Sequence, residues 1–401
     1  MEENLEGIMW SDNWWIECDK AWFVDGRQNI LCRIDLNTNE CEIVAGIPDS
    51  TIKNFRLNSR CIKCGKDVFC MPQYGNSIWV YDTNNKIFSG ITISNPDMVC
   101  LLMYDFWKHG DKIFAISVGL KKIIEIDIQS KKIESQYTIC EKGNIAKSIM
   151  IENEIYILEL ENNDIYRFCL NSKTFQVYSI PNIQERMYTL CFDDDKFWMS
   201  GYKKKIYVWT KDNVVRVIDN FPLDFGIYDF SVDTVGRADC IIDEYKTPTF
   251  LYSVMVGDYI WYIPFLTNQI IYVDKKTYNL YTFDVKEECE TKASILKNEM
   301  RQKYLLEYVK DNRYIGVFSF MNSSILEIDA LNLVYQYKQY YVQEDHINRY
   351  AQICHNTFNE KITWQRQVYQ KKLCIDNNIK QGECKCSIGQ AIYNLFMKTR
   401  D

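Results

Sequence analysis

Histidine, proline and glycine are scarce in this chain, and each scarcity narrows what the protein can be. Only three of the 401 residues are His, at positions 109, 346 and 355. Because metal sites and nucleophile–base pairs mostly use His, we expect no His-based catalytic site. Gly and Pro number 16 and 7, which argues against collagen-like or long disordered stretches. The P-loop, G-x-G-x-x-G and G-x-S-x-G motifs are also missing, so the sequence carries no nucleotide-binding or serine-hydrolase fingerprint.

The chain also lacks the positive charge that nucleic acids attract. Its formal net charge is −7, whereas nucleic-acid binding calls for a clustered basic surface. The N-terminal MEENLEGIMW has neither a positive segment nor an apolar core, and no apolar run approaches the roughly 20 residues that span a bilayer. We therefore expect a soluble, cytoplasmic protein without nucleic-acid or membrane partners. The Ile-, Lys-, Asn- and Tyr-rich composition suits an AT-rich bacterial genome.

Cysteine, in contrast, is abundant, with 16 residues scattered over the chain. In a cytosolic protein such residues are expected to be reduced thiols that pack as small apolar side chains. Cys61 and Cys64 form a C-x-x-C, and Cys384 and Cys386 form a C-x-C, so the two pairs offer four zinc ligands. However, a strand at 61–64 points residues i and i+3 to opposite faces. The sequence thus favours packing, and we expect neither a metal nor a cofactor.

One pattern returns seven times along the chain: an apolar pair, a short loop, and a strand that reads I-x-x-hydrophobic-D. Its first residues are Trp22, Val68, Ile113, Ile155, Phe197, Ile260 and Tyr314. The steps between them are 42–46 residues, and then 63 and 54. A period of roughly 40–50 residues built from short strands indicates one four-stranded blade per repeat. The sequence therefore predicts an all-β, seven-bladed β-propeller over residues 1–345.

Each repeat can be divided into four strands, a to d. In the third repeat they fall near 104–107, 112–117, 123–127 and 133–139, with turns rich in Asn, Asp, Lys and Thr. An Asn precedes strand c in several repeats, at positions 29, 76, 163, 268 and 322. Because Asn side chains readily bond to nearby backbone groups, we expect each of these to close its own b–c turn.

Two connections are longer than the others. They cover 223–249, between repeats five and six, and 286–303, between repeats six and seven; the second reads as a short helix. Both join strand d to the next strand a, so they share a face with the b–c loops. Function in repeat proteins concentrates where loops vary on a rigid scaffold, and this insertion-bearing face is the expected binding face.

The repeat stops after Val342, and residues 346–401 are predicted to be a separate C-terminal extension. Ser387 and Gln390 form a capping box. Apolar residues follow at helical spacing, at positions 388, 391, 392, 395 and 396. We expect an amphipathic helix that packs on the propeller, and a helix that docks a partner is the alternative.

The strand c motifs, such as IWVYDTNNK at 78–86 and IIYVDKKTYN at 270–279, resemble the seven-bladed propellers of the kelch and YVTN-type repeat group. The resemblance covers residues 13–342. The double glycine of kelch blades is absent, as are the Gly-His and Trp-Asp dipeptides of WD-repeat blades. The resemblance therefore implies the architecture and transfers no functional residue.

Aromatic and arginine residues mark the expected binding face. The candidates, which lie near its rim or on the inner strands, are Arg27, Tyr74, Trp107, Arg186, Tyr202, Tyr228 and Phe265. Because Tyr, Trp and Arg are enriched in recognition surfaces, we expect a monomeric, non-catalytic scaffold that binds a protein or peptide there.

The alternative is an enzyme that acts on carbohydrate or a small polar metabolite at the mouth of the central channel. Its carboxylates would come from Glu185, Asp224 or Asp229, although such a pair needs a defined separation in space. Converging carboxylates in a deep polar pocket would favour the enzyme, and a flat aromatic face would favour the scaffold.

Overall fold

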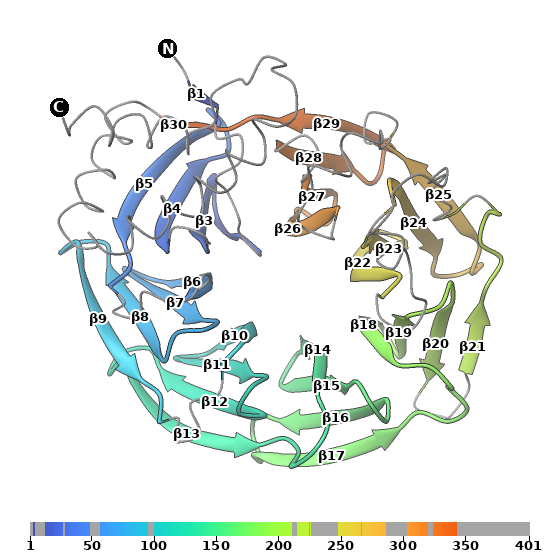
Figure 1. Cartoon of the computed structure of the whole chain (residues 1–401), viewed down its shortest axis with the longest axis horizontal. Helices are drawn as coiled ribbons and strands as arrows, with labels where there is room; N and C mark the ends of the chain where they lie inside the picture. Colours follow the sequence, from blue (N-terminus) through green and yellow to red (C-terminus); the bar gives the residue numbers. More distant parts are fainter. Residues whose placement is uncertain are drawn as a thin grey trace, which may run out of the picture. The chain divides into compact units, whose positions relative to one another are not determined.

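The computed structural model describes residues 3–4, 13–26, 29–48, 57–94, 100–210, 215–223, 225, 248–265, 267–285, 303–319 and 324–342. Within these ranges the fold is the all-β, seven-bladed propeller that the repeats predict (Figure 1). The helices predicted within 286–303 and 387–396, and the extension 346–401, lie outside the described residues. No helix that could span a membrane occurs in the described part of the chain.

Every repeat supplies four antiparallel strands, and they follow in chain order from strand a to strand d. Blades 1 and 2 consist of β2 (Trp15–Glu17), β3 (Lys20–Asp25), β4 (Ile30–Asp35) and β5 (Glu40–Gly46), and of β6 (Asn58–Cys64), β7 (Asp67–Pro72), β8 (Ser77–Asp82) and β9 (Ile87–Thr92). Blades 3 and 4 consist of β10 (Met103–His109), β11 (Lys112–Ser117), β12 (Lys122–Asp127) and β13 (Lys132–Thr138), and of β14 (Ile145–Ile151), β15 (Glu154–Glu159), β16 (Asp164–Cys169) and β17 (Thr174–Ser179).

Blades 5 and 6 consist of β18 (Met187–Asp193), β19 (Lys196–Gly201), β20 (Ile206–Thr210) and β21 (Val215–Ile218), and of β22 (Phe250–Val256), β23 (Tyr259–Pro264), β24 (Gln269–Asp274) and β25 (Leu280–Asp284). Blade 7 consists of β26 (Tyr304–Lys310), β27 (Tyr314–Ser319), β28 (Ser324–Asp329) and β29 (Val334–Lys338). The first sheet gains two short strands, because β30 (Tyr341–Val342) pairs parallel with β5 and antiparallel with β1 (Glu3–Asn4).

The chain divides into two compact units. The first unit contains Met1–Tyr104, Ser323–Ile325 and Tyr337–Asp401, and the second contains Asp105–Asn322 and Leu326–Gln336. Blades 1 and 2 therefore belong to the first unit, and blades 4, 5 and 6 belong entirely to the second. The inner strands of the second unit are the first strand of each of its sheets, such as β14, β18 and β22 (Figure 1).

The core of the second unit lies between neighbouring sheets. Between blades 3 and 4, the fully buried Ile123 belongs to the same apolar cluster as Ile157 and Phe168. Between blades 5 and 6, Trp198 packs in the same way with Tyr262. Each buried side chain of this size contributes roughly 1.5–3 kcal/mol relative to an exposed one. Strands b such as β11 and β19 are buried at every residue but the first, because successive side chains point to opposite sheet faces and both faces have a neighbour.

The Asp that ends the repeat motif caps the turn between strands c and d. Asp82 accepts the backbone N–H groups of Asn84 and Asn85 at 2.9 and 3.0 Å, and the ammonium of Lys66 lies 2.8 Å from its second oxygen. The same turn is capped in four other blades, by Asp35, Asp127, Asp274 and Asp329. A carboxylate that accepts several backbone N–H groups holds a tight turn, so this part of the motif is structural.

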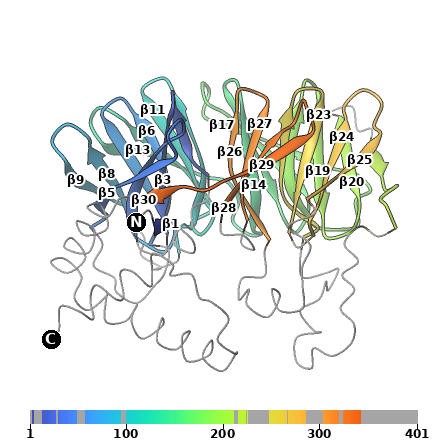
Figure 2. The same ribbon diagram turned by 90° about the horizontal axis from the view of Figure 1, so that it is seen from above.

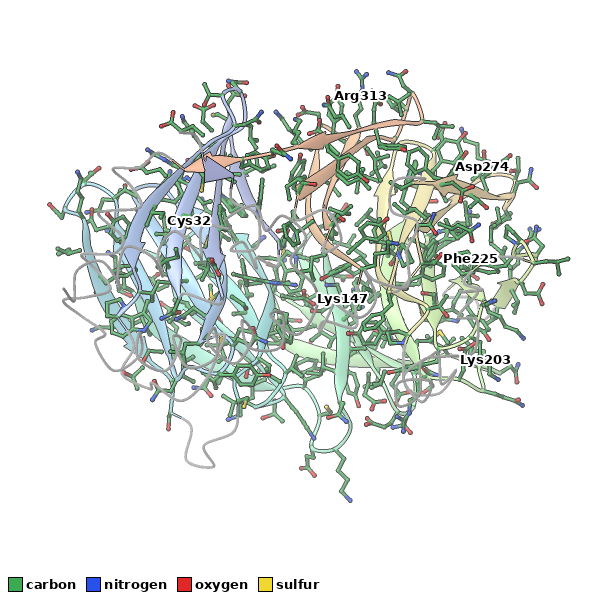
Figure 3. The ribbon with its side chains drawn as sticks, turned by 45° about the horizontal axis from the view of Figure 1, so that its top comes forward. Cys32, Lys147, Lys203, Phe225, Asp274 and Arg313 are labelled. Carbon is green, nitrogen blue, oxygen red and sulfur yellow. The ribbon has the colours of Figure 1, made fainter. Side chains whose placement is uncertain are left out.

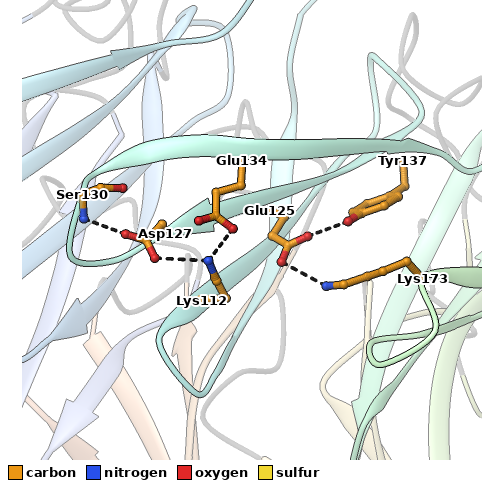
Figure 4. Close-up of polar contacts among 7 residues, drawn as sticks. All are labelled: Lys112, Glu125, Asp127, Ser130, Glu134, Tyr137 and Lys173. Carbon is orange, nitrogen blue, oxygen red and sulfur yellow. Dashed lines mark hydrogen bonds and ion pairs between the residues drawn. The ribbon is translucent and has the colours of Figure 1, made fainter.

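Blade 3 shows how these polar groups also join neighbouring blades (Figure 4). Lys112 contacts Asp127 at 3.2 Å and also reaches Glu134 on strand d. Glu125 accepts the hydroxyl of Tyr137 at 2.7 Å and pairs with Lys173, on the c–d turn of blade 4, at 3.0 Å. Strand c of blade 3 and the c–d turn of blade 4 are therefore linked by an ion pair.

Blade 4 carries Cys169 where five other blades carry the capping Asp. A hydrogen bond from the Ser172 side chain and the backbone N–H groups of Ser172 and Asn171 stabilise the thiolate and lower the pKa of Cys169 to about 7. The ion pair beside this turn is also reversed in sign, since strand b supplies Glu154 and strand c supplies Arg167. The nest of donors is thus retained in blade 4, and a thiol occupies the place of the carboxylate.

The Asn residues before strand c do not only close their own turns, contrary to the sequence-based expectation. Asn29 donates to the carbonyl of Ile47, after strand d, at 3.2 Å. Asn163 donates to the carbonyl of Glu185 at 2.7 Å and accepts the N–H of Met187 at 2.8 Å, on the connection into the next blade. The d–a connection passes the same end of the blade as the b–c turn, so an amide side chain there can bridge the two. Asn322 lies outside the described residues.

The capping carboxylates predict an acid-labile fold. The pKa of Asp35 is lowered to about 2, chiefly by Lys20, and that of Asp127 to about 2, chiefly by Ser130; the pKa values of Asp82 and Asp329 are also lowered. Their usual value is about 3.9. Because the folded-state pKa values are depressed, this stabilisation is present above pH about 4 and is lost as the pH falls toward about 2.

We expect the urea midpoint of unfolding to fall steeply between those pH values. The double variant Asp82→Asn/Asp329→Asn should have a lower midpoint at pH 7 and a flatter acid limb. An acid limb identical to that of the wild type would contradict a role for these caps.

The lowered pKa of Cys169 predicts selective reactivity near neutral pH. Thiolate is the nucleophilic form, so iodoacetamide at pH 7 should modify Cys169 faster than Cys140, whose pKa is raised by burial. Peptide mapping by mass spectrometry measures both rates. Ser172→Ala removes the largest cause of the shift and should slow the reaction of Cys169 alone; equal rates at the two thiols would refute the assignment.

Candidate functional site

The second unit has two distinct ends, which we call the insertion end and the hairpin end. The insertion end carries the b–c loops and the d–a connections, and the hairpin end carries the a–b and c–d turns. The strands run between these two ends (Figure 2). Both long connections leave strand d and enter strand a, from β21 to β22 and from β25 to β26, so both belong to the insertion end, as the sequence predicts.

The first long connection is fastened at both of its ends to the b–c loop of blade 5. Lys204 donates to the carbonyl of Phe225 at 2.6 Å, and Phe225 is buried. Where the connection returns, Thr249 donates from its backbone to Gly201 at 3.0 Å and from its hydroxyl to the carbonyl of Lys203 at 2.9 Å. The loop at 202–205 therefore holds both described ends of this connection; Lys203 and Phe225 are labelled in Figure 3.

The second long connection is fastened in the same way to the b–c loop of blade 6. Val285 donates to the carbonyl of Asn268 at 3.4 Å, and the Asn268 side chain donates back to Val285 at 3.3 Å. At the other end Lys303 donates to the carbonyl of Phe265 at 2.7 Å. Each insertion thus starts and finishes on the b–c loop of the blade it leaves.

Gly201 allows the residues that lead into β18, the first strand of blade 5, to approach the loop at 202–205. It pairs with Met187, the first residue of β18, and a Cβ at position 201 would collide with the carbonyl oxygen of Arg186. Only glycine permits that approach. As a result the exposed Arg186 and the half-buried Tyr202 lie on neighbouring turns of the insertion end.

Tyr202 is part of a small aromatic group at this position. Its ring meets that of Tyr188 edge-on, with centroids 6.4 Å apart. Burial raises the pKa of the Tyr202 hydroxyl, and the charge of Arg186 acts in the opposite direction. The hydroxyl therefore stays protonated at neutral pH and is available as a hydrogen-bond donor.

Glu185, a catalytic candidate of the alternative function, holds the loop in place. Its two oxygens accept the backbone N–H of Lys203 and the hydroxyl of Tyr207, both at 2.7 Å. The Glu185 side chain is buried. Burial of Tyr207 raises the pKa of its hydroxyl, and the hydrogen bond to Glu185 raises it further. These contacts fit a structural carboxylate. The other two candidates, Asp224 and Asp229, lie outside the described residues.

A pair of carboxylates that sequence reasoning missed lies on blade 4. Glu159 is 1% exposed and accepts the N–H groups of Glu161 and Asn162 at 2.9 and 2.6 Å. Glu161 accepts the backbone and side-chain nitrogens of Asn144 at 2.6 and 2.5 Å. Burial raises the pKa of Glu159, whereas the hydrogen bond between the two groups lowers that of Glu161. Glu159 is therefore the first of the two to take up a proton.

The inner strands of the second unit hold an ion pair close to the same end. Lys147 on β14 contacts Asp105 on β10 at 3.2 Å. The other oxygen of Asp105 accepts the N–H and the hydroxyl of Ser148 at 2.9 and 2.8 Å. The ammonium of Lys147 also lies 5.5 Å from the ring centre of Tyr252 on β22. Three inner strands thus meet at one cationic group, which no motif in the sequence indicates.

The structure brings together only part of the predicted recognition set. Arg186, Tyr202 and Phe265 lie on the insertion end of blades 4 to 6. Tyr74 is 40% exposed on the b–c loop of blade 2, in the first unit. Trp107 is half-buried and packs against the core between blades 3 and 4. Arg27 and Tyr228 lie outside the described residues.

No group of three metal-ligating side chains occurs among the residues that the structure describes. Cys61 and Cys64 both lie on β6, as predicted, and both are buried. Cys61 is directly opposite Cys70 on β7, and burial raises the pKa of both thiols. The C-x-C at 384–386, which would complete a zinc site, lies outside the described residues.

Comparison with known proteins identifies the fold and no family. No protein-family model matches the chain, and no curated protein is significantly similar to it in sequence. Among solved structures, the computationally designed protein Ika8 aligns with a TM-score of 0.50 at 8% identity, over 85% of this chain and 90% of that one. Dihydro-heme d1 dehydrogenase NirN, solved in complex with DHE, aligns with a TM-score of 0.51 at 11% identity, over 83% of this chain and 66% of that one, slightly under two thirds of its length. Identities this low show a shared architecture alone.

The contact at Gly201 predicts that the insertion end is intolerant of a side chain there. Gly201→Ala should destabilise the protein by about 1–3 kcal/mol, because the added methyl group must displace backbone rather than a flexible side chain. Gly90→Ala is the matched control, since its Cβ would meet only the ring of Trp79, at 3.1 Å. Urea unfolding of both variants measures the difference, and equal losses would show that the approach of Arg186 to Gly201 is not tight.

Proposed function

We propose that this protein is a non-catalytic scaffold that binds a protein or peptide partner through the insertion end of its second unit. In this proposal it is a monomeric, cytoplasmic bacterial propeller related to the kelch and YVTN-type group. Arg186, Tyr202 and Phe265 are the anchors. They carry the residue types that dominate binding energy in protein interfaces.

The observation that supports the proposal is that each insertion is held at both of its ends by hydrogen bonds. The b–c loops of blades 5 and 6 hold both ends of these connections, by backbone hydrogen bonds from Thr249, Val285 and Lys303 and by the Lys204 side chain, which donates to the carbonyl of Phe225. Tyr202 and Phe265 belong to those same loops. Side chains on a loop that is already ordered lose little entropy when a partner binds, so these loops suit recognition.

The alternative, an enzyme acting on carbohydrate or a small polar metabolite, has one candidate pair in the described residues. Glu159 with its raised pKa would be the acid and Glu161 the base. However, both oxygens of each carboxylate already accept hydrogen bonds from the loops at 144 and 161–162. This engagement favours a role in holding the loops, and the scaffold is the better-supported function.

The proposal predicts that binding depends on the insertion end. The triple variant Arg186→Ala/Tyr202→Ala/Phe265→Ala should weaken binding of a partner, recovered by quantitative pull-down and measured by calorimetry, by about 100-fold, because anchors of roughly 1–2 kcal/mol each are lost. The melting temperature should change little, since Arg186 is exposed and the two rings are only partly buried.

The matched control carries substitutions in c–d turns. Asn84→Ala, in the first unit, and Lys276→Ala, at the hairpin end of the second, change two exposed turn residues and should leave binding unchanged. A partner lost by the control and kept by the triple variant would place binding at the other end. Tyr74→Ala tests separately whether the first unit contributes.

A further inference from the structure

The cationic side chains of the second unit differ in their surroundings at its two ends. At the hairpin end four of them are neutralised by carboxylates, in the pairs Lys112–Asp127, Lys173–Glu125, Lys275–Asp193 and Arg313–Asp329 at 2.6–3.2 Å. Two members of these turns, Asp274 and Arg313, are labelled in Figure 3 on the end opposite Lys203. These paired charges serve the turns, and Lys132 and Lys310, which form no ion pair with any described residue, stand apart from one another on different blades.

At the insertion end, three cationic side chains have no such compensation. Arg186, Lys203 and Lys205 form no ion pair with any described residue. The charge of Arg186 contributes to lowering the pKa of Glu161, but as the smallest of the causes, and the two are not within ion-pair distance. These three residues stand on the neighbouring turns that Gly201 brings together.

Lys147 extends this positive region toward the inner strands. One of its ammonium hydrogens serves Asp105, and the Tyr252 ring faces it; no other partner occurs among the described residues. Because Asp105 is also held by both donors of Ser148, the ammonium is kept in a defined place with donors to spare. Its side chain is 23% exposed. Tyr252 follows Thr249, the residue that fastens the first insertion, by three positions.

The repeat itself shows that the fold does not require a cation at this inner position. Lys147 is the third residue of strand a. The third residues of the corresponding strands in blades 5 and 7 are Thr189 and Leu306, both uncharged, whereas blade 2 has Arg60. A cation is therefore present in some blades and absent from others, so the propeller fold does not require one at this position.

We propose that the insertion end of blades 4 and 5 recognises an acidic segment of a protein partner. Carboxylates of that segment contact Arg186, Lys203 and Lys205, and one carboxylate reaches Lys147 as the innermost contact. The inference rests on the proposed scaffold function and adds the chemistry of the partner. In a protein with a net charge of −7, an uncompensated positive region steers an acidic partner to one place.

A peptide suits this region better than a nucleic acid does. Glu185 lies on the same connection as Arg186, and Glu159 and Glu161 lie at the b–c loop of blade 4; their charges would repel a continuous row of phosphates. A peptide can space its acidic residues between them and set its own aromatic or apolar groups on Tyr188 and Tyr202. Nucleic acid is therefore one of the outcomes of the test.

The test uses three fluorescent probes with the full-length protein. They are a twelve-residue peptide that repeats Glu-Tyr-Glu-Gly, the same peptide with Gln in place of Glu, and a twelve-nucleotide oligothymidine. Anisotropy at 50 and 300 mM NaCl should show the Glu peptide binding about tenfold more tightly than the other two at low salt. The gap should narrow at high salt, because exposed charges are then screened.

Two variants with the same change in net charge locate the effect. Arg186→Gln/Lys203→Gln/Lys205→Gln should reduce the affinity for the Glu peptide to that for the Gln peptide. Lys132→Gln/Lys276→Gln/Lys310→Gln, at the hairpin end, should leave it unchanged. Equal losses in the two variants would mean that only net charge matters, and tighter binding of the oligothymidine would point to nucleic acid; either result overturns the inference.

Lys147 is tested on its own by removal and by replacement of its charge. Lys147→Met should weaken binding of the Glu peptide several-fold, and Lys147→Arg should retain it. If Lys147→Met lowers the melting temperature without changing the affinity for the Glu peptide, Lys147 only stabilises the fold through its ion pair with Asp105. If the Gln peptide binds as tightly as the Glu peptide, the acidic specificity is overturned. If Tyr202→Ala/Phe265→Ala then abolishes binding of the Gln peptide, the scaffold function still stands.

Discussion

Both faces of each sheet in this fold are apolar, and that constraint governs the rest of the structure. A four-stranded sheet with Ile, Val and aromatic residues on both sides cannot stand alone in water, so it is stable only between neighbours. In the second unit the apolar faces of successive sheets are filled by residues such as Phe168, Trp198 and Tyr262. Because strand interiors are thus committed to packing, recognition chemistry is left to the turns and to the inner edge of each sheet.

The two ends of the second unit use their polar residues for different purposes. At the hairpin end, carboxylates such as Asp127 and Asp329 cap tight turns and neutralise nearby Lys or Arg. At the insertion end, polar side chains such as Asn163 and Glu185 join a b–c loop to the connection that enters the next blade. The first arrangement pairs Lys and Arg residues with carboxylates, and the second leaves Arg186, Lys203 and Lys205 without an ion-pair partner among the described residues, around the loop that holds the first insertion. This asymmetry supports the proposal that binding occurs at the insertion end.

Because the blades repeat, corresponding positions of different blades can be compared within one chain. Cys169 stands where five other blades have a capping Asp, and Lys147 stands where blades 5 and 7 have Thr189 and Leu306. Such departures separate what the blade requires from what a particular blade adds. The donors of the capped turn are retained around Cys169 and lower its pKa, whereas Lys147 carries a charge that blades 5 and 7 do without.

Sequence periodicity by itself determined the number of blades, the strand order and the end on which both insertions lie. Strand b of the third repeat was predicted at 112–117, where β11 is observed, because its short apolar run is a local property of the chain. The periodicity did not determine which predicted residues come together. Trp107, a predicted recognition residue, packs against the core, and Lys147, Asp105 and Tyr252 meet although up to 147 positions separate them. Those contacts depend on how sheets pack side by side, and only the tertiary structure decides that.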